Sequence, residues 1–566
     1  MKNPTKPTIH ILLLFSALAL AFSFRLIRLG AMPLFGSEAE IALDALSIAQ
    51  GSPSDVGAFP AIVGLTGLDF LFFMPGTFLA RFWGAVFSGM IVMLPFLFRQ
   101  RIGLWGSTAA SFILALSPEM VGPSRLIGTP MMAMVCLLLS LGFLFHQKPI
   151  LTGIFLALGL MSGPGFWFGV LILGLAFLAA DWLFMAGSDL FPLKLEGKGR
   201  FWLLFGLSFG LVLLLVGTGF FMAPYLLSGV LSGLVDFVRG IFEPLSVSLL
   251  FRLLSLLAYA PGAIIFGLWG GIRGLLLRNK LDMFLLLWFG FGLVFFLVYP
   301  AATPSYLVWV TLPLWVLASR AFVQVWRFPR NSQLVVVGTI LLVVVASAFM
   351  LLALRTLIRP GLSQDQQLNS FIALLGGIIL LVAVVLLVHF GWGEEVALSG
   401  FLSGMAGVLL AGMVALSVNT TSLSTESSFE LWLPEEEVIS SEWLQVSIDR
   451  VLEWNKIRNA PVEIAVADLD SPALAWALQD YAPVDFVPYV PPQSIPGILI
   501  SDVQALPEIA SAYRGQDLVW SREVLWDEMS AFQTLEWLII RKAPTEEHQI
   551  ILWVRTDLMP DEQFSP

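Results

Sequence analysis

The chain has 566 residues, of which 58% are hydrophobic and 12% are charged, and its mean hydropathy of +0.87 excludes an ordinary soluble globular protein. The net charge of −10 and the lack of a basic segment interleaved with aromatic residues exclude nucleic-acid binding. The single cysteine, Cys136, excludes an intramolecular disulfide and a cysteine-rich metal site, and the four histidines are too scattered to suggest a histidine-based metal cluster.

Apolar stretches of about 20 residues recur along the chain and predict a polytopic α-helical membrane protein. We expect about thirteen spans, with the lipid bilayer as the first partner of the chain. They fall near 10–28, 80–98, 104–121, 129–145, 149–161, 165–184, 201–222, 251–270, 283–299, 306–325, 333–354, 369–390 and 398–417. Around Gly163, the pattern fits either two short helices or one broken helix.

Basic residues in the loops predict how the chain is oriented in the plasma membrane. With the N-terminus and its Lys2 in the cytoplasm, five successive inner loops carry arginine or lysine, as the positive-inside rule requires. These basic positions are Arg99, Arg101, Lys148, Lys194, Lys198, Arg200, Arg273, Arg278, Lys280, Arg327 and Arg330. Two later loops fit less well, since Arg355 and Arg359 fall outside. The scheme places the loop 29–79 and the C-terminal region on the extracytoplasmic side.

The first outer loop, 29–79, contains an acidic turn at residues 32–40. Ser37 followed by Glu40 matches a capping box and predicts a helix that begins at Glu38. At about 100° per residue, Glu38 shares a face with Ala42 and Ala45, whereas Glu40 and Asp44 face water.

Glu38 is therefore the first candidate for a catalytic residue. A carboxylate at a membrane marks a functional site by default, and a buried one can act as a general base or hold a divalent metal. The equally weighted alternative is that Glu38 only complements the positive end of its helix. No other residue pattern indicates a metal.

Four further residues of the outer loops are candidates for binding substrate. The planar guanidinium of Arg125 suits a phosphate, with an interfacial anchor as the alternative. Arg81 has the same two interpretations, and the anchor is favoured. Tyr299 flanks a short outer turn and is most simply an aromatic of the membrane interface. Asp236 lies in an amphipathic stretch at 224–250. The remaining polar candidates of these loops are Glu40, Asp69, Glu119, Arg239 and Tyr306.

The composition changes near residue 420, which divides the chain into a membrane domain, 1–419, and a soluble domain, 420–566. Helical patterns at 443–458 and 472–481 alternate with strand-like runs at 462–466, 497–500 and 550–554. This alternation predicts a small extracytoplasmic α/β domain.

Several short motifs together resemble the GT-C superfamily of membrane glycosyltransferases, most closely its protein O-mannosyltransferase and aminoarabinose-transferase branch. The motifs are the first outer loop with residues 33–39, the segments 80–85 and 99–103, Ser117-Pro118 with Ser124-Arg125, and the Tyr299 turn followed by 309–315. The resemblance covers most of residues 10–325.

The resemblance implies an enzyme that moves a sugar from a polyprenyl-phosphate donor to a glycan, lipid or protein acceptor on the extracytoplasmic face. The family usually has an Asp-Glu pair in its first loop. Here the glutamate is Glu38, and Ser37 stands at the aspartate position. An acid expected after Arg125 and an arginine expected at the turn near Tyr299 have no counterpart in 126–130 and 301–304.

Two functions therefore stay open. The first is a glycosyltransferase that uses Glu38 as its carboxylate and Arg125 for the donor phosphate, with the acceptor bound between the first outer loop and the C-terminal region. The alternative is a non-catalytic relative that binds a lipid-linked sugar or scaffolds cell-envelope assembly. A transporter is a third and weaker reading, because no internal repeat is visible.

Overall fold

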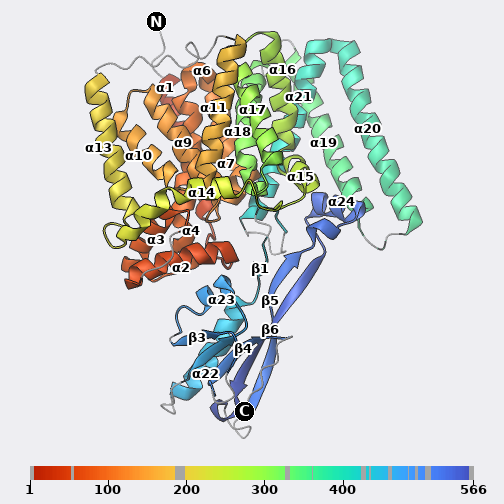
Figure 1. Ribbon diagram of the computed structural model, residues 1–566. Coiled ribbons are helices and arrows are strands. Elements are labelled where there is room, and N and C mark those ends of the chain that lie inside the picture. Colours follow the sequence, from red (N-terminus) through yellow and green to blue (C-terminus); the bar gives the residue numbers. More distant parts are fainter. Residues whose placement is uncertain are drawn as a thin grey trace.

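The computed structural model shows a broad block of helices from which a smaller sheet domain projects (Figure 1). The structure describes residues 6–52, 57–184, 198–325, 332–359, 361, 363–421, 429–432, 435–456, 462–481, 483–490, 495–503 and 511–559. This arrangement confirms the predicted class, a polytopic α-helical membrane protein with an α/β domain near its C-terminus. The basic positions Lys2, Lys194, Arg327 and Arg330 lie outside the described residues.

Nine helical segments of the described chain are long and apolar enough to cross a membrane. They are α1 (Lys6–Leu26), α4 to α5 (Thr77–Gly89 and Leu94–Leu97, joined by the 3₁₀ turn Met90–Met93), α11 (Pro164–Phe184), α13 (Lys198–Gly217), α17 (Lys280–Val298), α18 (Leu307–Val325, preceded by the turn Pro304–Tyr306), α19 (Gln333–Leu357), α20 (Gln364–Trp392) and α21 (Glu394–Thr420). The pair α15 (Leu249–Tyr259) and α16 (Leu268–Leu276) is bent by 83° and adds one more if it counts as a single span.

The predicted count of thirteen spans is not confirmed. Three of the expected spans correspond to helices of 12 to 16 residues, which are shorter than the roughly 20 residues that a bilayer core requires. They are α7 (Leu104–Leu116), α9 (Pro130–Phe145) and α10 (Pro149–Leu160). The ambiguity around Gly163 resolves into two helices: α10 packs against α9 and α13, and α11 packs against α17.

The first outer loop forms two helices, α2 (Gly36–Gln50) and α3 (Pro60–Phe72), which pack against each other beside the sheet domain (Figure 1). The predicted burial pattern is confirmed, because Glu38, Ala42 and Ala45 are buried and Glu40 is exposed. The predicted capping box is wrong. The helix begins at Gly36. The backbone N–H of the preceding residue, Phe35, donates a hydrogen bond to the carboxylate of Glu38 (3.3 Å). Glu38 is three residues after Phe35, which is the spacing that such a contact needs.

The rest of the bundle consists of short elements that connect the spans. They are α6 (Arg99–Ile102), α8 (Pro118–Ser124), η2 (Pro224–Val230), α14 (Ser232–Arg239) and the π-helical turn η3 (Ala263–Gly267).

The sheet domain contains six strands in the order β1-β5-β6-β4-β2-β3. The strands are β1 (Glu437–Val438), β2 (Ile464–Ala467), β3 (Val484–Val487), β4 (Ile498–Asp502), β5 (Tyr513–Val524) and β6 (Thr545–Arg555). Strand β2 is parallel to β3 and β4, and the other pairs are antiparallel. Helices α22 (Ser441–Lys456) and α23 (Pro472–Ala477) share an apolar core with the sheet.

Several contacts seat the sheet domain on the helical block, and two of them are made by helices. Helix α23 packs against α2 of the first outer loop. The long β5–β6 hairpin carries α24 (Ala531–Ile540) near its far end, and its Trp537 lies against Phe251 and Tyr259 of α15 (Figure 1). The first outer loop and the sheet domain lie on the same side of the helical block, which we call the domain side (Figure 1). Helix α1 begins on the opposite side.

Candidate functional site

Glu38 and Arg81 form a buried ion pair between α2 and α4. Arg81 donates from Nη2 to Oε2 of Glu38 (2.5 Å) and from Nε to Oε1 (3.0 Å), a bidentate arrangement. The backbone N–H of Ile127 donates to the same Oε1 (2.8 Å). With the contact from Phe35, both oxygens of Glu38 accept two N–H groups each, and the side chain has no exposed surface. In this conformation Glu38 positions the first outer loop, and its role as a general base stays a prediction.

Arg81 also binds the main chain that joins α1 to α2. Its terminal nitrogens donate to the carbonyl groups of Leu29 (3.3 Å), Met32 (2.9 Å) and Pro33 (2.9 Å). Carbonyl groups past a helix end have no partners within the helix, so a buried arginine can satisfy several of them. The interfacial anchor favoured for Arg81 from the sequence is not what the structure shows, because the guanidinium is buried and binds carbonyl groups of the protein.

Arg125 binds the end of α1 in the same manner. Its Nη1 donates to the carbonyl groups of Phe24 (3.0 Å), Arg25 (3.2 Å) and Ile27 (2.8 Å). Its Nη2 donates to the carbonyl groups of Arg28 (3.2 Å) and Thr421 (3.3 Å), and the latter residue directly follows α21. The side chain is 7% exposed. Arg125 therefore joins the first and last membrane helices here, and the predicted phosphate contact stays a prediction.

Tyr299 and Asp236 belong to a second group, formed by α14 and the turn between α17 and α18. Tyr299 is buried, stacks on Phe237 with ring centroids 5.2 Å apart, and donates to its carbonyl group (3.1 Å). Asp236 is partly exposed and faces Arg239 at 3.7 Å. The five predicted residues thus fall into two groups: Glu38, Arg81 and Arg125 around the end of α1, and Asp236 of α14 with Tyr299 of the neighbouring turn.

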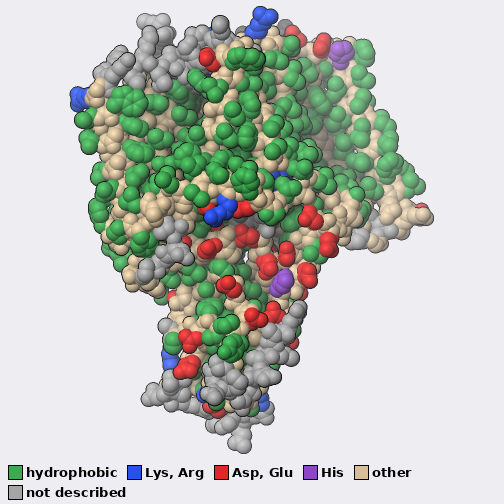
Figure 2. Space-filling model, viewed as in Figure 1, with side chains coloured by type: hydrophobic (Ala, Val, Ile, Leu, Met, Phe, Trp, Pro, Cys, Tyr) green, Lys and Arg blue, Asp and Glu red, His purple; other side chains and the backbone are tan. Residues whose placement is uncertain are grey.

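A polar cleft lies between α2 and the sheet domain. Its volume is about 630 Å³, and it is bounded on one side by α2 and on the other by the ends of β2 and β3 with the start of α23. Four of its lining side chains are carboxylates: Glu40, Asp44, Asp468 and Asp470. This is where the sequence predicted an acceptor site, between the first outer loop and the C-terminal region. Figure 2 shows acidic side chains gathered at this junction.

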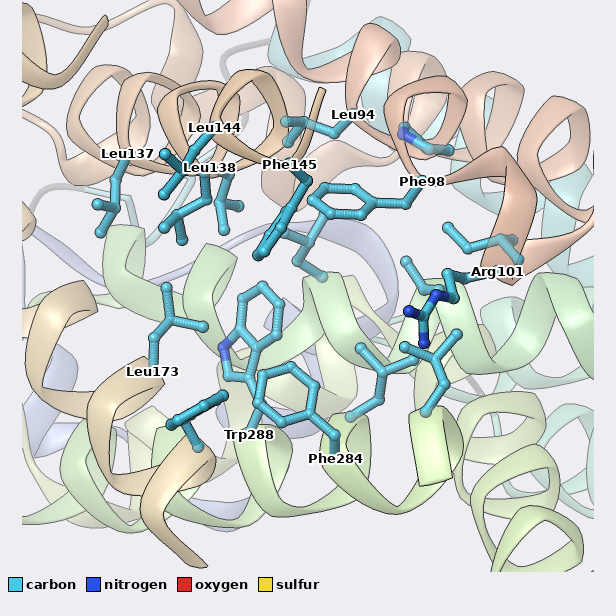
Figure 3. Close-up of a pocket in the computed structure, with 18 of the residues that line it drawn as sticks. Leu94, Phe98, Arg101, Leu137, Leu138, Leu144, Phe145, Leu173, Phe284 and Trp288 are labelled. Atoms are coloured by element: carbon cyan, nitrogen blue, oxygen red, sulfur yellow. The ribbon is translucent and has the colours of Figure 1, made fainter. Parts of the chain in front are cut away.

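A separate cavity of about 460 Å³ lies within the helical block, on the side away from the sheet domain. Its wall is almost entirely apolar and includes Leu94, Phe98, Leu138 and Trp288, with Arg101 at its edge (Figure 3). A cavity with an apolar wall, formed among the membrane helices, suits a hydrocarbon chain.

Comparison with known proteins identifies solved structures with the same fold. No protein-family model and no curated protein sequence matches the chain. Among solved structures, the chain is similar to ArnT from Cupriavidus metallidurans bound to undecaprenyl phosphate, with a TM-score of 0.55 and 14% identity over 98% of this chain and 99% of that one. The apo state of the same protein has a TM-score of 0.52 at 14% identity over the same shares. The chain has the fold of this ArnT. The resemblance to the aminoarabinose-transferase branch is thereby confirmed at the level of the fold, from the first helix to the sheet domain.

Within this ArnT-like fold, the structure shows an arginine that sequence reasoning missed. Arg252 of α15 is fully buried and donates to the carbonyl groups of Phe296 (2.9 Å), Tyr299 (2.7 Å) and Pro300 (2.6 Å). The turn near Tyr299, which has no arginine of its own, is therefore held by one from another helix. The signal in the sequence was a lone arginine in an otherwise apolar segment.

A second group that the sequence did not reveal connects the ArnT-like bundle to the sheet domain. Tyr259 donates to Oε2 of Glu430 (2.7 Å) and accepts the N–H of Leu431 (2.9 Å). Arg541 of the β5–β6 hairpin lies over the Tyr259 ring, with its guanidinium carbon 5.0 Å from the ring centroid. Its Nε atom is 3.9 Å from Oε1 of Glu430. Burial raises the pKa of Glu430, and the nearby Arg541 opposes part of that shift.

Proposed function

We propose that this protein is a GT-C glycosyltransferase that moves a sugar from a polyprenyl-phosphate donor to an acceptor on the extracytoplasmic face of the plasma membrane. The observation that carries the proposal is the cleft between α2 and the sheet domain in a chain with the ArnT fold. The ArnT structure bound to undecaprenyl phosphate supports a polyprenyl phosphate as the donor lipid. In this scheme the domain side is extracytoplasmic, and the N-terminus is cytoplasmic, in accord with the positive-inside rule.

The chemistry requires a base and a site for a phosphate leaving group. A nucleophilic oxygen of the acceptor attacks the anomeric carbon, the bond from that carbon to the phosphate oxygen breaks, and polyprenyl phosphate leaves. A carboxylate that takes the acceptor proton accelerates this step by about 10²- to 10⁴-fold. Glu40 and Asp44 line the cleft and are the best placed to do so. Glu38, on the buried face of the same helix, holds that helix in position through Arg81.

The apolar cavity supplies room for the hydrocarbon chain of the donor lipid. An isoprenoid chain is apolar along its length, so a preformed cavity with an apolar wall matches it in polarity. The cavity is lined by helices α9, α11, α17 and α18, all of which run toward the domain side. We therefore assign the donor chain to the bundle and the acceptor to the cleft.

One observation favours the second candidate function, a non-catalytic protein that binds a lipid-linked sugar. Glu38, which the family resemblance identifies with the catalytic pair, has both oxygens engaged by four N–H groups, and Ser37 stands where the aspartate is expected. In this conformation both carboxylate oxygens are directed at N–H groups of the protein, so neither is directed at the hydroxyl group of an acceptor.

Transfer of a radiolabelled sugar from a polyprenyl-phosphate donor by the purified full chain in lipid nanodiscs distinguishes these functions. We expect labelled product with the unchanged protein, and at least a hundredfold loss of rate in Glu40→Gln or Asp44→Asn with folding unchanged. Glu453→Gln, an exposed acid on α22, is the matched control. Donor binding without product from any donor would favour the non-catalytic function. Loss of both binding and product would refute both. If Glu38→Gln loses transfer at unchanged stability while Glu40→Gln and Asp44→Asn keep it, Glu38 is the catalytic residue.

A further inference from the structure

Three potential metal ligands from separate segments meet on one face of the sheet domain. They are Glu436, just before β1, Glu523 of β5 and His548 of β6. One ligand atom from each lies within 4.8 Å of the others. The imidazole Nε2 of His548 is 3.5 Å from Oε1 of Glu436 and 3.9 Å from Oε2 of Glu523. Figure 2 shows a histidine among acidic side chains over this hairpin.

The two separations from the Nε2 atom of His548 are close to the spacing of ligands around a small divalent ion, and the two carboxylates lie within 4.8 Å of each other. Zinc binds imidazole nitrogen and carboxylate oxygen at about 2.0–2.2 Å, so two ligands of a tetrahedral ion stand roughly 3.4 Å apart. The pair from His548 to Glu436 already has this spacing, and the pair to Glu523 exceeds it by a few tenths of an ångström. Small rotations of exposed side chains would close that difference.

A hydrogen bond orients the first of the carboxylates. The hydroxyl of Ser521 donates to Oε2 of Glu436 (2.5 Å), which leaves Oε1 directed to His548. Hydrogen bonds of this kind, which hold a ligand in place without touching the ion, are a regular part of metal sites. Ser521 is itself almost fully buried, so the contact is held by the core of the hairpin.

The strand register separates this cluster from the nearest arginine. In the β5–β6 ladder, Ser521 pairs with His548 and Glu523 with Glu546, while Arg522 pairs with Glu547. Side chains alternate between faces along a strand, so Arg522 and Glu547 point to the opposite face, where they form a 2.9 Å ion pair. The guanidinium of Arg522 therefore does not neutralise the negative charge of the cluster.

We propose that Glu436, Glu523 and His548 form a zinc site on the sheet domain, with the remaining coordination position taken by water. The ligands are about half exposed, so an ion can enter from solvent. Because Glu436 lies where the chain arrives from the membrane helices and the other two lie on the long hairpin, a bound ion would tie these segments together. The site is independent of the transfer reaction proposed above.

Calorimetric titration with Zn²⁺ tests the site. The full chain is first treated with a chelator, and the chelator is then removed. We expect one equivalent to bind and to raise the thermal unfolding temperature. His548→Ala should abolish that binding, Glu436→Gln and Glu523→Gln should each weaken it at least tenfold, and Ser521→Ala should weaken it about tenfold. Glu547→Gln, on the opposite face of the same strand, should bind as the unchanged protein does.

Two results of the Zn²⁺ titration would overturn the proposal. One is that the unchanged protein binds no Zn²⁺ at free Zn²⁺ concentrations up to the micromolar range. The other is binding that survives His548→Ala, which would place the ion elsewhere. Titration with Co²⁺ adds a spectroscopic measurement. Side chains with a purely structural role would not produce a cobalt absorption band. A tetrahedral cobalt absorption band is expected in the unchanged chain and not in His548→Ala, and its presence in both would likewise refute the assignment.

Discussion

The backbone N–H of Ser37 donates to the carboxylate of Glu435 at a distance of 3.0 Å, across 398 residues of sequence. Ser37 lies in the first turn of α2, where the N–H groups have no partner within the helix and the helix dipole favours a negative charge. The acid that complements this helix end thus comes from the chain leading into β1. The turn that most suggests the fold in the sequence is anchored by the C-terminal part of the protein.

We predict that Glu435→Ala loosens the start of α2. Loss of a capping carboxylate costs about 0.5–2 kcal/mol. Hydrogen exchange of the amides at residues 36–40 should accelerate by about tenfold, while the exposed Glu453→Ala on α22 should leave them unchanged. Equal protection of these amides in Glu435→Ala and the unchanged protein would show that the contact contributes nothing.

Arg81→Met should destabilise the membrane domain strongly. Removing one partner of a buried ion pair costs about 3–5 kcal/mol, because the other charge stays buried without compensation. Here Leu29, Met32 and Pro33 would also lose a donor. Thermal unfolding in detergent measures the effect, with Arg239→Met as the control, since Arg239 is largely exposed.

Glu38→Gln should be milder than Arg81→Met, because the amide oxygen can still accept N–H groups and the guanidinium keeps its carbonyl partners. The double variant should recover part of the stability lost in Arg81→Met, since it removes the uncompensated carboxylate. A double variant that is less stable than Arg81→Met alone would contradict this account of the pair.

The Glu430 group should make stability depend on pH. Its pKa in the folded protein is raised by burial, so the folded state holds the proton at pH values where the unfolded chain has lost it. Its contribution is complete below the ordinary glutamate pKa of about 4.3 and is lost as the pH rises through the raised value. Unfolding temperatures measured from pH 4 upward should fall less steeply in Glu430→Gln than in the unchanged protein. An identical slope in the two proteins would refute the shift.

Leu138→Trp should fill part of the apolar cavity and displace a bound lipid chain. Leu138 is buried and lines the cavity. Mass spectrometry of lipids that co-purify with the protein should show polyprenyl phosphate at least severalfold reduced. Leu211→Trp, on the lipid-exposed surface of α13, is the control. Unchanged lipid in Leu138→Trp, with the protein folded, would place the donor chain elsewhere.

Some features of the C-terminal region could be predicted locally and others could not. The strand-like runs predicted at 462–466 and 497–500 correspond to the buried strands β2 and β4, and their apolar composition alone indicates this. Strand β5 contains Arg514, Gly515, Gln516 and Asp517, so its extended state follows from pairing with β6 along eleven positions. Helix α24 was also missed, because it lies at the far end of the hairpin and is defined by its packing on α15.

The sequence by itself determined the membrane class, the resemblance to GT-C proteins and the burial of Glu38, because hydropathy and helical periodicity are local properties of a chain. Only the tertiary structure decided what Glu38 does there. Its partners Arg81 and Ile127 come from other elements, and neither their approach nor the saturation of both carboxylate oxygens is encoded in spacing along the chain. The same holds for the convergence of Glu436, Glu523 and His548. Hydrogen bonds and coordination depend on ångström distances between distant segments, and those distances exist only once the bundle and the sheet have packed.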